Sequence, residues 1–167
     1  MSVYQVIDAM EHLNELHQHL IDVAKEKQQA ILNNDMQHLT QIMNKETRLL
    51  KQVTESEIAR VDAANVFLAE KGIRSQLKLT ITEMTRLVFD QEEKQHLLDA
   101  QRRLLDTLLA LKDLNNTNKE MIDQSLSFID YSLNLIVSRP EDDMIYQNPS
   151  QQNNHRSLNR NFFDART

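Results

Sequence analysis

The sequence predicts an all-α fold: an elongated antiparallel helical hairpin plus a long third helix in a coiled-coil-like bundle, with a short connecting helix and a disordered C-terminal tail. Two observations predict it. The 167 residues include one Gly and two Pro, and 5% are aromatic, which suits long helices better than a β-domain or glycine-built loops. Apolar residues also recur at alternating steps of three and four, the period of a helix.

The first helix is expected to start near Ser2, which has capping-box spacing to Gln5. Its apolar residues keep a heptad-like register: Val6, Met10, Leu13, Leu20, Ala24 and Ile31, widened by Leu16 and Val23. Residues 33–35, Asn-Asn-Asp, follow. Because these side chains bond to nearby backbone groups, they favour turns, and we expect the chain to reverse there.

The second helix is expected to run from about Met36 to about Glu70. Its predicted seam consists of Leu39, Met43, Leu50, Val53, Ala64 and Phe67. Charged residues interrupt this seam at 46, 57 and 60 (Glu46, Glu57 and Arg60), and we expect them at its rim with their charged ends in water. The single glycine, Gly72, is expected to end the helix, because glycine adopts the left-handed capping conformation freely.

Residues 76–89 are compatible with two structures. Leu77, Leu79 and Ile81 alternate with polar residues as in a strand, whereas Leu77, Ile81, Met84 and Val88 have helical spacing. A single strand would have nothing to pair with. A short helix is therefore favoured.

Asp90 and Glu93 have capping-box spacing and open the longest predicted helix, about residues 91–138. Pro140 is expected to end it, because proline disfavours helical geometry in the preceding residue. The predicted domains are a helical bundle at 1–138 and a flexible tail with docking segments at 139–167.

Two asparagines, Asn115 and Asn118, fall where the apolar seam of this third helix is predicted. The other predicted seam residues are Leu104, Leu108, Leu111, Ile122, Ser125, Ile129, Ser132 and Ile136. A polar pair in a seam can fix register or partner choice. The alternative is that the heptad drifts and leaves the asparagines on the surface of the bundle.

The last half of the third helix carries more apolar residues than a narrow seam needs. They are Met121, Ile122, Leu126, Ile129, Leu133 and Ile136, with Phe128 and Tyr131 on other faces. We expect about half of them to face the core. The others would form an exposed apolar patch, which marks a binding site.

The tail has a composition that cannot bury enough surface to fold alone. It nevertheless holds Tyr146, Leu158, Phe162 and Phe163, residues that are unusual in a disordered linker. We interpret the segments around them as docking sites. The alternative is a tail that folds back on the bundle.

The composition argues against an enzyme and against metal or cofactor sites. There is no Cys, and no Gly-rich phosphate loop or nucleophile motif occurs. No two of His12, His17 and His19 have the spacing of a helical metal clamp. His38, His96 and His155 are isolated, and no glycine follows His38 or His96 to admit the partner of a histidine phosphotransfer domain.

The formal net charge of −6 argues against binding to nucleic acid or anionic membrane. No apolar run approaches the roughly 20 residues of a membrane span, and the N-terminus lacks the features of a signal peptide. A cytoplasmic protein without membrane insertion is expected.

Three short motifs occur along the chain, and their order is more specific than any one of them: AILNND at 30–35, NKETRLL at 44–50 and LKDLNNTN at 111–118. With these motifs, and with the same order of helices, the chain resembles the FlgN family over about residues 3–146. FlgN proteins are flagellar export chaperones for the hook–filament junction proteins.

The resemblance implies a cytoplasmic chaperone of the flagellar type III secretion system, with no nucleotide or metal. It would bind the terminal helices of hook-associated proteins 1 and 3 (FlgK and FlgL). The implied client-binding residues are Asn115, Asn118, Met121, Ile122, Leu126, Ile129, Leu133 and Ile136. Tyr146 matches a family tyrosine that contacts the export gate protein FlhA, although Gln147 stands where glycine is common.

Phe162 and Phe163 lie beyond the region of resemblance and are a candidate second docking segment. The alternative function is a structural or scaffolding coiled coil that self-assembles or bridges partners. The sequence leaves open whether the free protein forms a homodimer.

Overall fold

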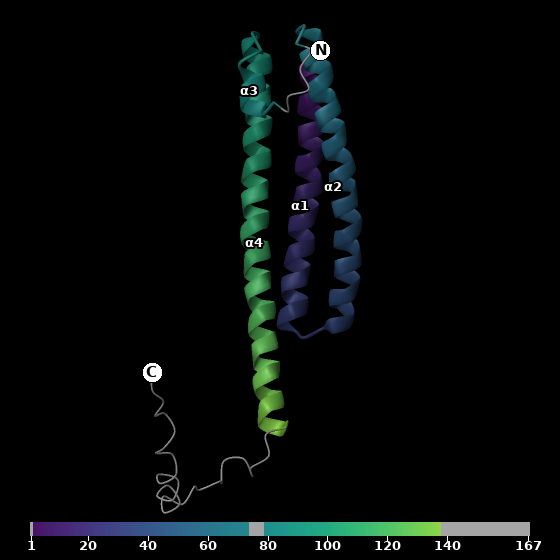
Figure 1. The fold of residues 1–167 in the computed structure, drawn as a ribbon, viewed down its shortest axis with the longest axis vertical. Coiled ribbons are helices and arrows are strands. Elements are labelled where there is room, and N and C mark those ends of the chain that lie inside the picture. The colour runs from purple at the N-terminus through teal and green to yellow at the C-terminus, as the bar shows by residue number, and fades with distance from the viewer. Residues whose placement is uncertain (1, 74–78, 138–167) are drawn as a thin grey trace, which may run out of the picture. The chain divides into compact units, whose positions relative to one another are not determined.

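In a computed structural model of the protein, the structure describes residues 2–73 and 79–137. Within these ranges the chain forms four helices (Figure 1): α1 (Ser2–Leu32), α2 (Met36–Glu70), α3 (Ile81–Thr85) and α4 (Gln91–Val137). No strand occurs in the described part of the chain, and the predicted all-α class is confirmed. The predictions for the tail lie outside these residues.

The chain divides into two units, Met1–Leu126 and Ser127–Thr167. The first unit holds α1, α2, α3 and α4 as far as Leu126. In the second unit the described residues are Ser127–Val137, the last eleven of α4. The boundary expected after residue 138 stays a prediction.

The predicted reversal between the first two helices is confirmed. Asn34 adopts a left-handed backbone conformation with φ of 52°, which asparagine tolerates better than most residues. Asp35 caps α2, its side chain accepting a hydrogen bond of 3.0 Å from the His38 amide. The polar turn residues therefore end one helix and start the next.

Ser2 does not play the capping role expected of it. It is the first residue of α1, where the helix is expected to start. It is buried, and its hydroxyl donates to the Glu70 carboxylate at the end of α2. The serine thus joins the two ends of the hairpin.

The end of α2 follows the prediction for Gly72. This residue has φ of +73°, and its amide and that of Ile73 donate to Ala69 and Leu68 at 3.0 Å each. Carbonyls at the end of the helix are satisfied in this way.

The predicted short helix is confirmed over the strand alternative, but it is shorter than residues 76–89. Thr80 and Glu83 form a complete capping box at its start. The Thr-x-x-Glu pattern is visible in the sequence, but this cap was not among those predicted. Leu77, used there for both alternatives, lies outside the described residues. In α4, the expected cap is present, with the Glu93 amide donating to Asp90 Oδ1 at 2.9 Å.

α1 is the central helix of the first unit, with α2 and α4 packed on it (Figure 1). It has twelve buried residues, whereas α2 has five and α4 has three. The main core lies toward the start of α1 and includes Met10, Phe67, Met84 and Leu97. A smaller cluster lies near the turn and includes Val23, Ala30 and Ile42.

The predicted seam of α2 is partly wrong. Ala64 and Phe67 are buried, as expected, but Met43 and Leu50 are 54% and 50% exposed. The residues that pack on α1 are one position earlier in the heptad: Ile42 is buried and Leu49 packs against the smaller cluster. Ile42 with Leu49 and Met43 with Leu50 are both seven residues apart, so packing against α1 decides which pair is buried.

Candidate partner-binding surface

α4 runs parallel to α1, and three polar contacts fix their register. The contacts are Arg103 with Glu11, Thr107 Oγ1 with Asn14 Oδ1 at 2.6 Å, and Asn118 Nδ2 with the Ala24 carbonyl at 2.8 Å. Because residue numbers rise together in both helices, the helices point in the same direction. The last contact places Asn118 in the interface with α1.

The predicted seam of α4 is half confirmed. One set of predicted seam residues is buried or half-buried, namely Leu104, Leu111, Asn118, Ser125 and Ser132, and the other set is displaced by one position. The side chains turned toward α1 are buried or half-buried: Leu104, Thr107, Leu111, Leu114, Asn118 and Met121. Asn118 therefore lies in the seam, as predicted, but Asn115 is exposed. Leu108 and Ile122, also predicted for the seam, are 39% and 37% exposed.

A stripe of large apolar side chains is consequently left exposed on α4. We name it the α4 apolar stripe, and it consists of Ile122, Leu126, Ile129, Leu133 and Ile136. Their exposed fractions run from 37% at Ile122 to 80% at Ile136. About half of the six apolar residues in this segment were expected to face the core and the rest to be exposed. Met121 is half-buried, and the five stripe residues are all exposed. The patch is larger than expected.

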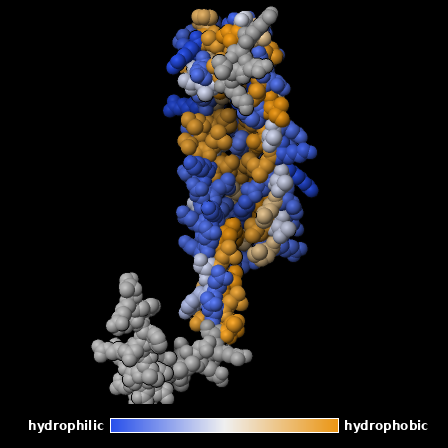
Figure 2. Space-filling model, viewed as in Figure 1, coloured by the Kyte–Doolittle hydropathy of each residue, from blue (hydrophilic) through white to orange (hydrophobic). Residues whose placement is uncertain are grey.

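The spacing of the stripe suits another helix. Its residues follow one another at steps of four, three, four and three, the spacing of a coiled-coil seam. Figure 2 shows apolar side chains gathered along α4. Exposed apolar residues at these steps are anchors for helix-in-groove recognition.

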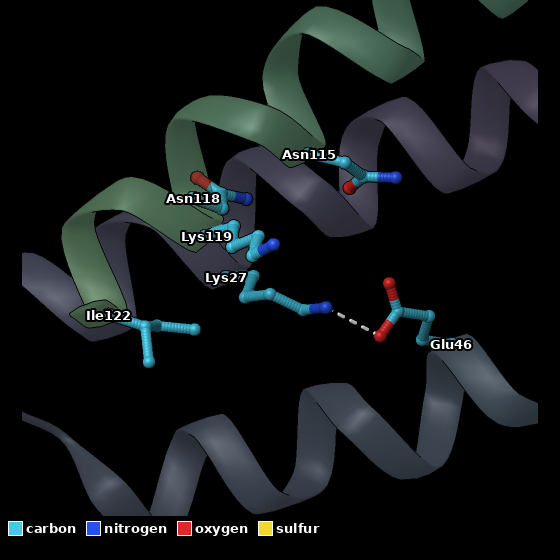
Figure 3. A pocket seen from close by; sticks show the side chains of 6 residues that line it. All are labelled: Lys27, Glu46, Asn115, Asn118, Lys119 and Ile122. Carbon is cyan, nitrogen blue, oxygen red and sulfur yellow. Dashed lines mark hydrogen bonds and ion pairs between the residues drawn. The ribbon is translucent and has the colours of Figure 1, made fainter.

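Beside this stripe, the first unit has a hollow of about 310 Å³. Side chains of α1, α2 and α4 line it (Figure 3): Lys27, Glu46, Asn115, Asn118, Lys119 and Ile122. The two asparagines singled out in the sequence thus meet at one hollow, although they differ in exposure. Ile122 belongs both to the hollow and to the stripe.

Two polar features mark this hollow. Lys27 Nζ lies 2.6 Å from Glu46 Oε2, and the two side chains are 16% and 22% exposed. Asn118 is 2% exposed, and its Oδ1 accepts no hydrogen bond from the described residues. Buried acceptors are nearly always paired in native proteins, which makes this oxygen unusual.

Other polar side chains have structural partners. Hydrogen bonds from Arg60 hold the pKa of Glu57 below its ordinary value, and those bonds raise the pKa of Arg60. His17 Nδ1 donates to the Leu13 carbonyl at 2.6 Å. His12 lines a second hollow, about 360 Å³, between α1 and α2. Across residues 2–73 and 79–137, no group of His, Cys, Asp and Glu has the arrangement of a metal site.

None of the helices in the described ranges combines the length and apolar character needed to cross a membrane. Three predicted docking residues, Tyr146, Phe162 and Phe163, lie outside those ranges.

Comparison with known proteins identifies the family. Residues 1–154 match the family described as FlgN protein. The chain is also 24% identical over 166 residues to the uncharacterized protein YvyG of Bacillus subtilis (strain 168), and the match covers 99% of each chain. No solved structure matches. FlgN proteins are flagellar export chaperones rather than enzymes, and a match over most of the chain shows that this protein belongs to the FlgN family.

Proposed function

We propose that this protein is a cytoplasmic chaperone that binds the terminal helices of hook-associated proteins 1 and 3 (FlgK and FlgL). It keeps these helices from assembling prematurely or being degraded, and it delivers them to the export gate protein FlhA. The α4 apolar stripe is the client-binding surface. Membership of the FlgN family supports a chaperone of flagellar export in general.

The observation that carries the proposal is the exposure of the stripe. Five large aliphatic residues at coiled-coil spacing are each at least 37% exposed. Burying such side chains against a partner helix is favourable by about 25 cal/mol per Å² of apolar surface. An amphipathic client helix supplies the complementary apolar face.

Two leucines of α4 allow a matched test. Leu133 belongs to the stripe, whereas Leu135 lies on another face of the helix and is 63% exposed. We expect Leu133→Asn to weaken binding to a terminal-helix fragment of hook-associated protein 1 about tenfold or more, because one apolar anchor is lost. Leu135→Asn should change the affinity less than threefold. Isothermal titration calorimetry measures both.

Equal effects of the two substitutions, or no binding by the wild-type protein, would count against the proposal. Circular dichroism of each variant checks that α4 is intact. Because both changes replace the same residue type in the same helical segment, their intrinsic effects on helix formation are matched.

We further propose that Tyr146 docks on FlhA when client is bound, and that Phe162 and Phe163 form a second docking segment. Truncation after Pro140 should leave the helical bundle folded and weaken client or gate binding. Tyr146→Ala should lower co-purification with FlhA and leave client affinity unchanged. Full-strength binding of both partners by the truncated protein would contradict this role.

The alternative function, a scaffolding coiled coil, rests on the same stripe, since its spacing also suits a second copy. Sedimentation velocity separates the two. A stable oligomer that does not bind client favours the scaffold, and a species that exchanges into a client complex favours the chaperone.

A further inference from the structure

The hollow of about 310 Å³ is lined by α2 on one side and α4 on another, with α1 between them (Figure 3). We call this hollow and its continuation along α2 and α4 the groove. On α2, Met43 and Leu50 lie one turn either side of Glu46, which lines the hollow, and residues three or four apart share a helix face. On α4, Leu108 and Ile122 are one heptad either side of Asn115. All four apolar residues are at least 37% exposed. The groove therefore has apolar residues along both walls.

The middle of the groove is polar. Glu46 pairs with Lys27 at 2.6 Å, and Lys119 lines the same hollow (Figure 3). Asn118 uses its Nδ2 to bond to Ala24, and its buried Oδ1 has no hydrogen-bond donor among the described residues. A bare buried acceptor is destabilising. This oxygen is enclosed in the free protein, so a ligand that brings a donor to this level would satisfy it once a neighbouring side chain at the hollow moves aside.

We propose that the groove binds one amphipathic helix of the exported client, as a fourth helix of the bundle. A side-chain amide or hydroxyl of that helix donates to Asn118 Oδ1. This inference rests on the proposed function and adds to it a second wall, on α2, and a rule for the client sequence. The client helix is apolar at heptad positions except for one Gln, Asn, Ser or Thr at the level of Asn118.

The charges at the hollow select a neutral donor. Glu46 is already paired with Lys27, and Lys119 leaves the hollow with a net positive charge. A client lysine or arginine would add to this charge, and like charges close together are unfavourable. An ionised carboxylate has no proton to donate. An amide suits the site best, because its oxygen can also accept a hydrogen bond from a lysine.

A client helix is favoured over a second copy by continuity. Ile122 is a member of the α4 apolar stripe and also lines the hollow, and Leu126 follows it one turn later. A helix bound to these residues meets the groove without a break. If the α4 helices of two copies paired in register, their Lys119 side chains would lie at the same level, and the like charges would be unfavourable.

The absence of cysteine from the chain allows a clean test by site-specific labelling. Leu50→Cys places an environment-sensitive fluorophore on the groove wall. Gln52→Cys is the control, because Gln52 lines the hollow on the other side of α2. With a terminal-helix fragment of hook-associated protein 1, emission at position 50 should shift to the blue and emission at 52 should not.

The predicted hydrogen bond between the client helix and Asn118 is tested by replacing each partner. Client fragments are prepared in which each amide or hydroxyl side chain of the bound helix is replaced in turn by Ala. We expect one replacement to weaken binding to the wild-type chaperone about tenfold. Binding to the Asn118→Leu chaperone should be insensitive to that same replacement, because the acceptor is gone.

The outcomes separate this inference from the proposed function. A client that binds and depends on Leu133, without a shift at position 50, would overturn the groove and leave the chaperone function standing. A shift at position 50 that follows the chaperone's own concentration, without client, would assign the groove to a second copy. A fragment that does not bind at all would overturn both.

Discussion

Asn118 donates a 2.8 Å hydrogen bond from its Nδ2 to the carbonyl of Ala24, across the interface of the two parallel helices. The same side chain leaves its Oδ1 buried and without a partner among the described residues. One half of this amide therefore fixes the register of α4 on α1, and the other half is an unmet hydrogen-bonding requirement. The unpaired oxygen therefore lowers the stability of the free bundle, whereas the bond to Ala24 adds to it.

Asn118→Leu should stabilise the free protein by about 1 kcal/mol. Removing an unsatisfied buried acceptor gains about 1–3 kcal/mol, and losing one hydrogen bond costs about 0.5–1.5 kcal/mol. The adjoining hollow of about 310 Å³ gives the larger side chain room. Urea unfolding followed by circular dichroism measures the change.

Asn115→Leu is the matched control, because Asn115 is exposed. Its effect should stay within about 0.5 kcal/mol, as for most surface substitutions. If the two substitutions change stability equally, Asn118 is not the buried member of the pair. A destabilised Asn118→Leu variant would mean that the bond to Ala24 outweighs the unpaired oxygen.

The ion pair between Lys27 and Glu46 should couple α1 to α2 more strongly than a surface pair does. Its side chains are 16% and 22% exposed, so removing one partner leaves a poorly hydrated charge. A double-mutant cycle of Lys27→Met and Glu46→Gln should give a coupling energy of about 1 kcal/mol or more. Chemical denaturation in low and high salt measures it.

The chain offers a control pair between the same two helices. Lys45 and Glu26 lie 3.1 Å apart and are 56% and 43% exposed. Their coupling should be about 0.5 kcal/mol or less and should fall with added salt. Equal coupling energies for the two pairs would show that burial does not strengthen the Lys27–Glu46 contact.

Much of the fold could be predicted from local signals. The turn after Leu32 and the stop at Gly72 depend on residues that favour one backbone conformation, and such preferences act without tertiary contacts. The capping box of Thr80 and Glu83 carries the same kind of signal and could have fixed the start of α3.

The faces of the long helices could not be predicted in the same way. In α2, Ile42 with Leu49 and Met43 with Leu50 are neighbouring apolar pairs of equal spacing. In α4, the positions 107, 114 and 121 lie beside the positions 108, 115 and 122, and each set contains two apolar residues. Periodicity does not choose between adjacent columns. The choice depends on what α1 presents, such as Asn14 beside Thr107, and that is a tertiary contact.

Gly72→Ala should destabilise the hairpin by about 1 kcal/mol through the backbone alone. Gly72 has φ of +73°, and a methyl group added there would meet no atom within 4 Å. The left-handed conformation costs an L-residue roughly 1–2 kcal/mol. Thermal unfolding measures the loss, and Gly72→Asn should lose less, because asparagine tolerates this conformation. Equal losses for Ala and Asn would point to a cause other than backbone conformation.

The capping box of α3 should make part of the protein's stability depend on pH. The backbone amide of Thr80, and then its hydroxyl, bond to Glu83 and hold the pKa of its carboxyl below the ordinary value of 4.5. A carboxyl whose pKa is lower in the folded state stabilises the protein above its unfolded pKa, and this contribution is lost as pH falls through the folded value. Wild type should therefore exceed Glu83→Gln in stability at pH 7.

This difference should shrink once the pH falls below 4.5, when the protonated glutamic acid comes to resemble glutamine. Urea midpoints of both proteins at pH 7, 5, 4 and 3 measure it, and the other carboxyls cancel in the comparison. Because α3 is a short helix, amide exchange at Glu83 reports the same change locally. A difference that stays constant from pH 7 to pH 3 would show that the charge of Glu83 does not stabilise the cap.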